Sequence, residues 1–70
     1  MSDAANTLSV VFRACGWKWD EVLLQTVASD LAAEGFTDIG SLCGAEMGEI
    51  VAADMWPLDV CQFVQTLASH

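Results

Sequence analysis

Residues 20–36, DEVLLQTVASDLAAEGF, decide the fold class of this chain. Leu23, Val27 and Leu31 recur every four residues and have further apolar neighbours, so the segment carries a wide apolar stripe at helical spacing. Its first residue is an aspartate, which is a good N-cap, and Gly35 is typical of a helix end. The segment therefore predicts a long amphipathic helix that packs on a core.

Glycine and proline divide the rest of the chain into further helical segments. Gly16 and Gly44 follow other apolar stretches, and Pro57 suits a first helical turn. The other helices expected from this punctuation cover residues 2–15, 37–43 and 45–54, and a last one begins at 57. Thr37 is the expected cap of the short middle helix. The chain is thus predicted to be one all-α domain over residues 1–70, a small five-helix bundle.

The predicted core takes the apolar residues that repeat at helical spacing in each of these segments. In the four helices other than 20–36, the residues expected to point inward are Leu8, Val11, Phe12, Cys15, Ile39, Leu42, Cys43, Met47, Ile50, Val51, Val60, Cys61, Val64, Leu67 and Ala68. The acids Glu46 and Glu49 are expected on the outer face of their helix.

The composition allows one small ordered domain and narrows the class of partner. The chain has 70 residues, 54% of them hydrophobic and 17% charged, so it is too short for a two-domain enzyme and too apolar to be disordered. Ten acids face two cations, Arg13 and Lys18, for a formal charge of -8. The clustered cations that neutralise phosphates are missing, which argues against direct binding to nucleic acid or to an anionic membrane.

The acids after residue 18 have no Lys or Arg in their own stretch of the chain. They are therefore either solvated, as a solubilising surface, or positioned to meet the cations of another protein. Asp30 and Glu34 lie one turn apart near the negative end of the long helix, where a carboxylate costs about 0.3–1 kcal/mol. This unfavourable placement hints at a binding face on that helix.

The sequence carries no recognisable targeting or membrane-spanning segment. Residues 1–3 include no basic group, and the apolar run 8–12 is too short for a secretory signal or a membrane span. The three cysteines are odd in number and widely spaced, which favours a reducing compartment over a disulfide framework. These features predict an intracellular, cytoplasmic module.

Catalytic and metal-binding chemistry finds little support in the sequence. Cys15, Cys43, Cys61 and His70 lack the close spacing of structural zinc ligands, and His70 is the last residue, where chains usually fray. The glycines between positions 35 and 48 lack the strand–GxxxxGK[ST]–helix context of a phosphate-binding loop. No catalytic residue, cofactor or metal ligand is predicted, and the chain is not expected to be an enzyme.

A longer pattern in the sequence resembles a known family. The pattern runs Leu31-x-x-Glu34-Gly35-Phe36-x-Asp38-Ile39-x-x-Leu42, then Glu46-x-x-Glu49-Ile50, then Met55-x-Pro57, then Val60-x-x-Phe63-Val64-x-x-Leu67. Over residues 19–67 it resembles the sterile alpha motif (SAM-like) family, in which a long helix leads through a glycine and an aromatic residue into short helices and a long closing helix. The chain departs from that family before Trp19 and at the start of the last helix, where Pro57-Leu58-Asp59 replaces a Gly-His-Arg-like sequence.

The resemblance implies a non-catalytic protein–protein interaction or oligomerisation module. Such domains pair head to tail, with an acidic middle region of one meeting the basic start of the last helix of another. Carried onto this chain, the acidic surface comprises Asp38, Glu46, Glu49 and Asp54. The end-helix surface, Pro57, Leu58 and Asp59, lacks the cations that a homotypic contact needs, and like charges across an interface lower affinity.

The chain is therefore expected to supply the acidic half of a contact with a basic partner domain, such as another SAM-like domain. Self-association through apolar contacts of Trp56 and Leu58 stays open, and Trp56 is the expected interface anchor.

Two other functions stay open at this point. The stretch Asp38-Ile39-Gly40-Ser41-Leu42 resembles the site of an acyl or peptidyl carrier protein, with Ser41 as the phosphopantetheine attachment residue. The high negative charge would also suit an acidic mimic that blocks a basic groove on another protein.

Overall fold

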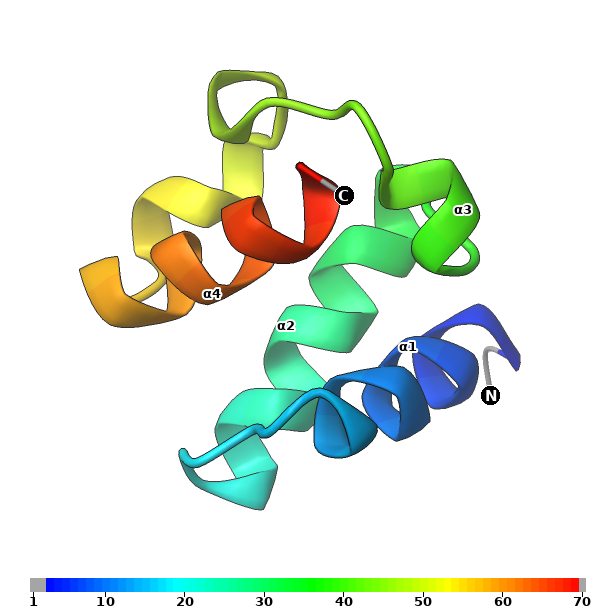
Figure 1. The fold of residues 1–70 in the computed structure, drawn as a ribbon, viewed down its shortest axis with the longest axis vertical. Helices are drawn as coiled ribbons and strands as arrows, with labels where there is room; N and C mark the ends of the chain where they lie inside the picture. Colours follow the sequence, from blue (N-terminus) through cyan, green and yellow to red (C-terminus); the bar gives the residue numbers. More distant parts are fainter. Residues whose placement is uncertain (1–2, 70) are drawn as a thin grey trace.

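The computed structural model describes residues 3–69, apart from the side chain of Met47, and this part of the chain is all-α. Its α-helices are α1 (Asp3–Ala14), α2 (Glu21–Ala33), α3 (Ile39–Leu42) and α4 (Leu58–Ala68). Two 3₁₀ helices, η1 (Met47–Glu49) and η2 (Val51–Met55), connect α3 to α4. In Figure 1, α2 lies in the middle of the view, with α1 on one side and α4 and η2 on the other. The predicted all-α class is confirmed.

The predicted count of five helices is wrong, because residues 45–54 form two 3₁₀ turns in place of a fourth α-helix. Ile50 interrupts the segment with an extended backbone, φ -102° and ψ 99°. From residue 50 to residue 56 the buried residues are Ile50, Ala53 and Trp56, a spacing of three that matches the three residues per turn of a 3₁₀ helix. Val51, which is expected inside, is 78% exposed, since this spacing turns it outward. The expectation for the Met47 side chain lies outside the described residues.

Gly16 and Gly35 end α1 and α2 as predicted. Both have positive φ, +100° and +97°, which a residue with a side chain rarely adopts. After α2, the Phe36 N–H donates to the Leu31 carbonyl at 3.0 Å and the Gly35 N–H donates to the Ala32 carbonyl at 3.1 Å, the Schellman arrangement. The equivalent pair of hydrogen bonds closes α1. The corners that follow the two helices are therefore set by local sequence.

The helix starts agree with the sequence only in part. Asp20 occupies the N-cap position of α2, although its side chain makes no capping hydrogen bond. The cap of α3 is Asp38 and not Thr37, because Asp38 and Ser41 form a reciprocal capping box. Pro57 stands at the N-cap position of α4, one residue before the first helical turn in which it is predicted.

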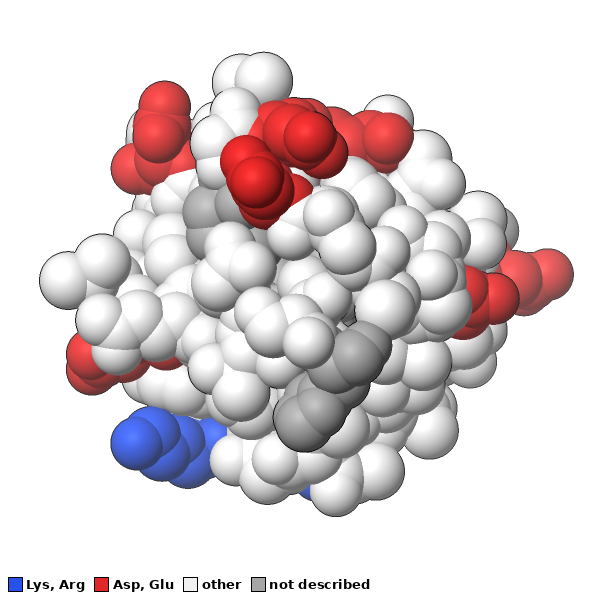
Figure 2. All heavy atoms as spheres, turned by 45° about the horizontal axis from the view of Figure 1, so that its top comes forward, with Lys and Arg blue, Asp and Glu red and all other residues white. Residues whose placement is uncertain are grey.

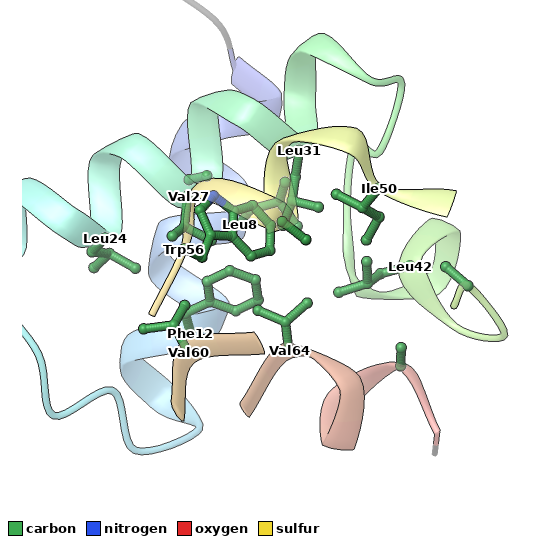
Figure 3. Close-up of a cluster of buried hydrophobic side chains, with 14 of the residues drawn as sticks. Leu8, Phe12, Leu24, Val27, Leu31, Leu42, Ile50, Trp56, Val60 and Val64 are labelled. Carbon is green, nitrogen blue, oxygen red and sulfur yellow. The ribbon is translucent and has the colours of Figure 1, made fainter. Parts of the chain in front are cut away.

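The core takes side chains from all four α-helices and from the 3₁₀ segment, as Figure 3 shows for the larger members. The Phe12 ring of α1 meets the Phe63 ring of α4 edge-on, with centroids 5.8 Å apart. The fully or nearly fully buried apolar side chains are Ala5, Leu8, Phe12, Leu24, Val27, Ala28, Leu31, Leu42, Ala45, Ile50, Ala53, Trp56, Val60, Val64 and Ala68. Val11, Ile39, Cys61 and Leu67 are partly buried against this core, and with them most of the predicted inward positions are confirmed.

The cysteines depart from that prediction. Cys15 and Cys43, which are expected in the core, are exposed, because each follows the last residue of its helix. Cys61 is half-buried, and its Sγ–H donates to the Ala53 carbonyl at 3.3 Å. This bond ties η2 to the first turns of α4.

An aromatic cluster closes the corner between α1 and α2. Trp17 and Trp19 meet with ring centroids 4.9 Å apart, and each also contacts Phe63 edge-on. The Trp17 indole N–H donates to the Asp20 carbonyl at 3.2 Å. The cluster therefore fixes both the start of α2 and the position of α4 against this corner.

Candidate functional site

The predicted acidic surface is solvent-exposed in the structure. Glu46 directly precedes η1, Glu49 is the last residue of η1, and Asp54 lies in η2 one turn before α4. Figure 2 turns the top of Figure 1, where η1 and η2 lie, towards the reader. Acidic side chains occupy the upper part and both flanks of this face, and cationic side chains are seen only at its lower edge. The two 3₁₀ helices therefore present carboxylates to solvent without a cation beside them in this view.

Both cations of the chain are engaged at the other end of the molecule. The Arg13 guanidinium forms an ion pair with the Glu21 carboxylate, and no other Lys or Arg ion pair occurs within residues 3–69. The Lys18 ammonium lies 5.3 Å from the centroid of the Trp19 ring, a cation–π distance. Of the acids after residue 18, Glu21 alone in the described range is paired with an internal cation. The charge of the other acids is therefore not neutralised by a Lys or Arg of this part of the chain.

Asp38 stands apart from the other acids of the predicted set. Its carboxylate oxygen accepts a hydrogen bond from the Ser41 N–H at 2.9 Å and thereby caps α3. In Figure 1, α3 lies on the opposite side of the view from η1 and η2. Asp38 therefore stabilises a helix start and does not join the acids around the 3₁₀ segment.

Trp56, the expected interface anchor, belongs to the core. It is only 7% exposed, and its indole N–H donates to a carboxylate oxygen of Asp30 at 3.0 Å. Figure 3 shows its ring beside Val27 and Leu8. The exposure expected of an interface anchor is not found at Trp56, because the spacing of three along η2 turns this side chain inward.

Asp30 and Glu34, whose placement hints at a binding face on α2, have structural roles. The Glu34 carboxylate accepts hydrogen bonds from the Val51 N–H at 3.0 Å and the Ala52 N–H at 3.4 Å, so it caps η2 across the chain. Asp30 holds the indole of Trp56. The unfavourable helix position of both carboxylates is thus offset by tertiary hydrogen bonds.

An open groove of about 630 Å³ lies between the 3₁₀ helices and α4. Its walls include Gly48 from η1, Ala53 and Asp54 from η2, and Leu58, Cys61 and Gln65 from α4. Two predicted site residues, Asp54 and Leu58, therefore meet at one groove. Leu58 is 71% exposed, so most of this apolar side chain faces solvent at the groove.

Asp59 does not share that groove. It lines a second hollow of about 430 Å³ on the side of α4 that faces Lys18 and Trp19. Gln62 and Thr66 line both hollows, so they form the ridge between them. The acids of the predicted set are thus divided: Asp54 lines the groove, Asp59 lines the second hollow and Asp38 caps α3. Glu46 and Glu49 are exposed at η1 and line neither hollow.

Sequence reasoning missed Met55 as a surface residue. It is the most exposed large apolar residue of the described range at 86%, and it follows Asp54 directly. The signal was present in the sequence, since apolar Ile50, Ala53 and Trp56 repeat every three residues. A 3₁₀ interpretation of that spacing would have placed Met55 outside.

Ser41, the alternative carrier residue, has its hydroxyl in the α3 capping box. The oxygen accepts hydrogen bonds from the N–H groups of Thr37 and Asp38 at 2.9 and 3.1 Å, and the hydroxyl donates to the Asp38 carbonyl at 2.9 Å. Attachment of a phosphopantetheine arm would remove the donated bond. The hydroxyl therefore already has a structural role at the start of α3.

Metal binding and membrane insertion find no support within residues 3–69. No group of three or more His, Cys, Asp or Glu side chains in this range could hold a metal ion. None of the helices described is both long enough and apolar enough to cross a membrane.

Comparisons with protein-family models, with curated proteins and with solved structures return no match.

Proposed function

We propose that this chain is a non-catalytic protein–protein interaction module with a SAM-like fold that presents an acidic surface to a basic partner domain. We call the exposed acids of the 3₁₀ segment, Glu46, Glu49 and Asp54, the acidic rim. The observation that carries the proposal is that the rim is exposed while both cations of the chain are engaged elsewhere. A basic partner would therefore meet no competing internal cation at this surface.

The order of the elements supports the SAM-like part of the proposal. The long α2 leads through Gly35 and Phe36 into the short α3, short helical turns follow, and the long α4 closes the chain. The preceding helix α1 contributes Leu8 and Phe12 to the same core. It is therefore an integral part of the domain, and the resemblance concerns the elements that follow it.

The charge of such a surface mainly affects how fast a partner associates and which partners are accepted. Exposed charges are screened over about 8 Å at physiological ionic strength, so the rim attracts a partner mainly at close approach. Complementary charges on two surfaces raise the association rate and reject partners of like charge more than they add affinity. The proposed contact should accordingly weaken as salt is added.

A gain-of-function experiment tests the proposal before any partner has been identified. In the family, the acidic surface meets the basic start of the last helix, where this chain carries Asp59 and, one turn later, Gln62, both exposed. The double variant Asp59→Lys/Gln62→Lys would carry both surfaces. We expect its mass by light scattering to rise with concentration at low salt and to return to the monomer value at high salt.

Two matched variants make the result specific. Glu46→Gln/Glu49→Gln in the same background should restore the monomer, because it removes the acidic half of the contact. Asp59→Asn/Gln62→Asn, which removes the acid without adding cations, should stay monomeric throughout. A lysine variant that is folded by circular dichroism, stays monomeric and does not bind the wild-type chain would contradict the proposal.

A further inference from the structure

We propose that the groove between η1, η2 and α4 receives the apolar face of a basic amphipathic helix from another protein. This inference rests on the proposed function and specifies its partner. Leu58 and Cys61 would contact the apolar side chains of that helix, while Asp54 and the other rim acids would face its lysines and arginines. The composition of the groove wall, the shape of the groove and the charge of the chain each support this occupant.

The groove combines an apolar wall with an acidic edge. Ala53, Leu58 and Cys61 supply carbon and sulfur surface, and the Cys61 Sγ–H is already satisfied by the Ala53 carbonyl. Asp54 lines the same groove, and Glu49 is the chain neighbour of the lining residue Gly48. A ligand that fits must therefore be apolar on one side and cationic on its flanks.

The walls of the groove favour a helix over an extended segment. Peptides that bind by strand addition need an unpaired strand edge, and residues 3–69 form no β-strand that could offer one. Proline-rich extended peptides dock on aromatic-lined grooves, and no aromatic residue of the described range lines this groove. A helix satisfies its own backbone hydrogen bonds and needs only apolar contacts from the groove wall. The long wall formed by α4, from Leu58 to Gln65, gives such a helix a surface to lie along.

The charge of the chain excludes a second copy as the favoured occupant. A copy docked groove to groove would bring the acidic rims of two molecules together, each with a formal charge of -8. Neither cation lines the groove, because Arg13 pairs with Glu21 and Lys18 lies over Trp19 beside the second hollow. A cationic helix from a different protein has no such repulsion.

The probe for this inference is a synthetic peptide of leucine and lysine, about 18 residues long so that it can form a helix. Its leucines repeat at i, i+3, i+4 and i+7, and a control peptide of equal composition has them scrambled. Each is titrated into the isotope-labelled wild-type chain and followed by amide chemical shifts in NMR. We expect the amphipathic peptide to shift groove amides such as Gly48, Asp54 and Cys61 and to bind about tenfold more tightly than its control.

Matched substitutions separate apolar docking from simple charge attraction. Leu58→Ala should weaken the amphipathic peptide about five- to tenfold, whereas Val22→Ala, a truncation at a residue 78% exposed on α2, should leave its affinity unchanged. Asp54→Asn should weaken binding more than Asp20→Asn, which removes one acid at the distant corner before α2.

Each other outcome overturns a definite part of the proposal. Equal binding of both peptides, unaffected by Leu58→Ala but lost at high salt, would refute the helix in the groove and leave the acidic interaction surface standing. Absence of binding by either peptide at low salt would overturn the proposed function as well. Groove shifts that grow with protein concentration before any peptide is added would identify a second copy as the occupant and refute the basic helix.

Discussion

Trp56 and Leu58 lie two residues apart, yet the first is buried and the second is 71% exposed. Trp56 completes the inward row of η2 and donates its indole N–H to Asp30. Leu58 begins α4 and faces the open groove. At the scale of single residues, Trp56 therefore contributes to the stability of the fold, and Leu58 contributes to the surface available to a partner.

Substitution of these two residues should affect different measurements. We expect Trp56→Ala to lower the free energy of unfolding by about 3–5 kcal/mol, since it empties a core site, or to leave the chain unfolded. Leu58→Ala should change it by less than about 0.5 kcal/mol, because the side chain is in water. Urea unfolding followed by circular dichroism measures both.

A milder variant keeps this prediction testable if Trp56→Ala does not fold. Trp56→Phe retains most of the apolar volume but loses the hydrogen bond to Asp30, so it should cost about 1–3 kcal/mol. A stability equal to the wild type in Trp56→Phe, together with a large loss in Leu58→Ala, would show that the two roles are reversed.

Ser41 yields a prediction that separates the capping role from the carrier role. Ser41→Ala removes the hydroxyl that serves both Thr37 and Asp38, so we expect a loss of about 0.5–2 kcal/mol in stability. Ser29→Ala, at an exposed site on α2, is the matched control and should have little effect. Protein co-expressed with a phosphopantetheinyl transferase should keep an unmodified mass, and an added arm at Ser41 would contradict the capping role.

Among the elements, η2 depends on a carboxylate from a different helix. It is too short to be stable by itself, and Glu34, the C-cap residue of α2, accepts hydrogen bonds from its first two N–H groups. The Cys61 thiol of α4 holds the same element from the other side. The position of the groove wall therefore depends on α2 and α4 together.

Loss of the Glu34 carboxylate should loosen η2 selectively. We expect Glu34→Ala to cost about 0.5–2 kcal/mol and to speed hydrogen exchange at the Val51 and Ala52 amides, with a smaller effect for Glu34→Gln, whose amide oxygen still accepts. Glu49→Ala removes an exposed acid nearby and should leave both amides unchanged. Unaltered exchange in Glu34→Ala, measured by NMR, would refute the tertiary cap.

The sequence predicts those helix boundaries that are marked by one or two residues at the boundary itself. Gly16 and Gly35 mark helix ends because the left-handed backbone needed there favours glycine, and Pro57 marks the start of α4. The segment 45–54 was wrongly predicted to be an α-helix, because Ile50 and Val51 also fit a period of 3.6 when taken alone. Only the longer row that ends at Trp56 favours a period of three.

The candidate site was harder to predict than the fold. Glu46 and Glu49 could be placed on the surface from their spacing, whereas Asp54 and Leu58 were predicted as surface residues through the family resemblance. The roles of Asp30 and Glu34 depend on partners 17 to 26 residues away, so no local pattern could indicate them. Acids that looked available for a partner were therefore already engaged within the fold.

For the whole molecule, the surface area is that of a compact folded chain, and the charge opposes self-association. The accessible surface is 4167 Å², close to the roughly 4,250 Å² expected for a folded monomer of this mass. The formal charge of -8 opposes contact between like copies at low salt. The exposed side chains of Met55 and Leu58 remain available to a partner that supplies the missing cations.

If this chain supplies the acidic half of a contact with a different, basic protein, it should not associate with itself. The decisive experiment is size-exclusion chromatography with light scattering, run on the wild-type chain at low and high salt over a range of concentrations. We expect a constant mass of 7.5 kDa under all conditions. A mass that grows with concentration and persists at high salt would refute the proposed role, because the apolar groove would then be used between copies of the chain.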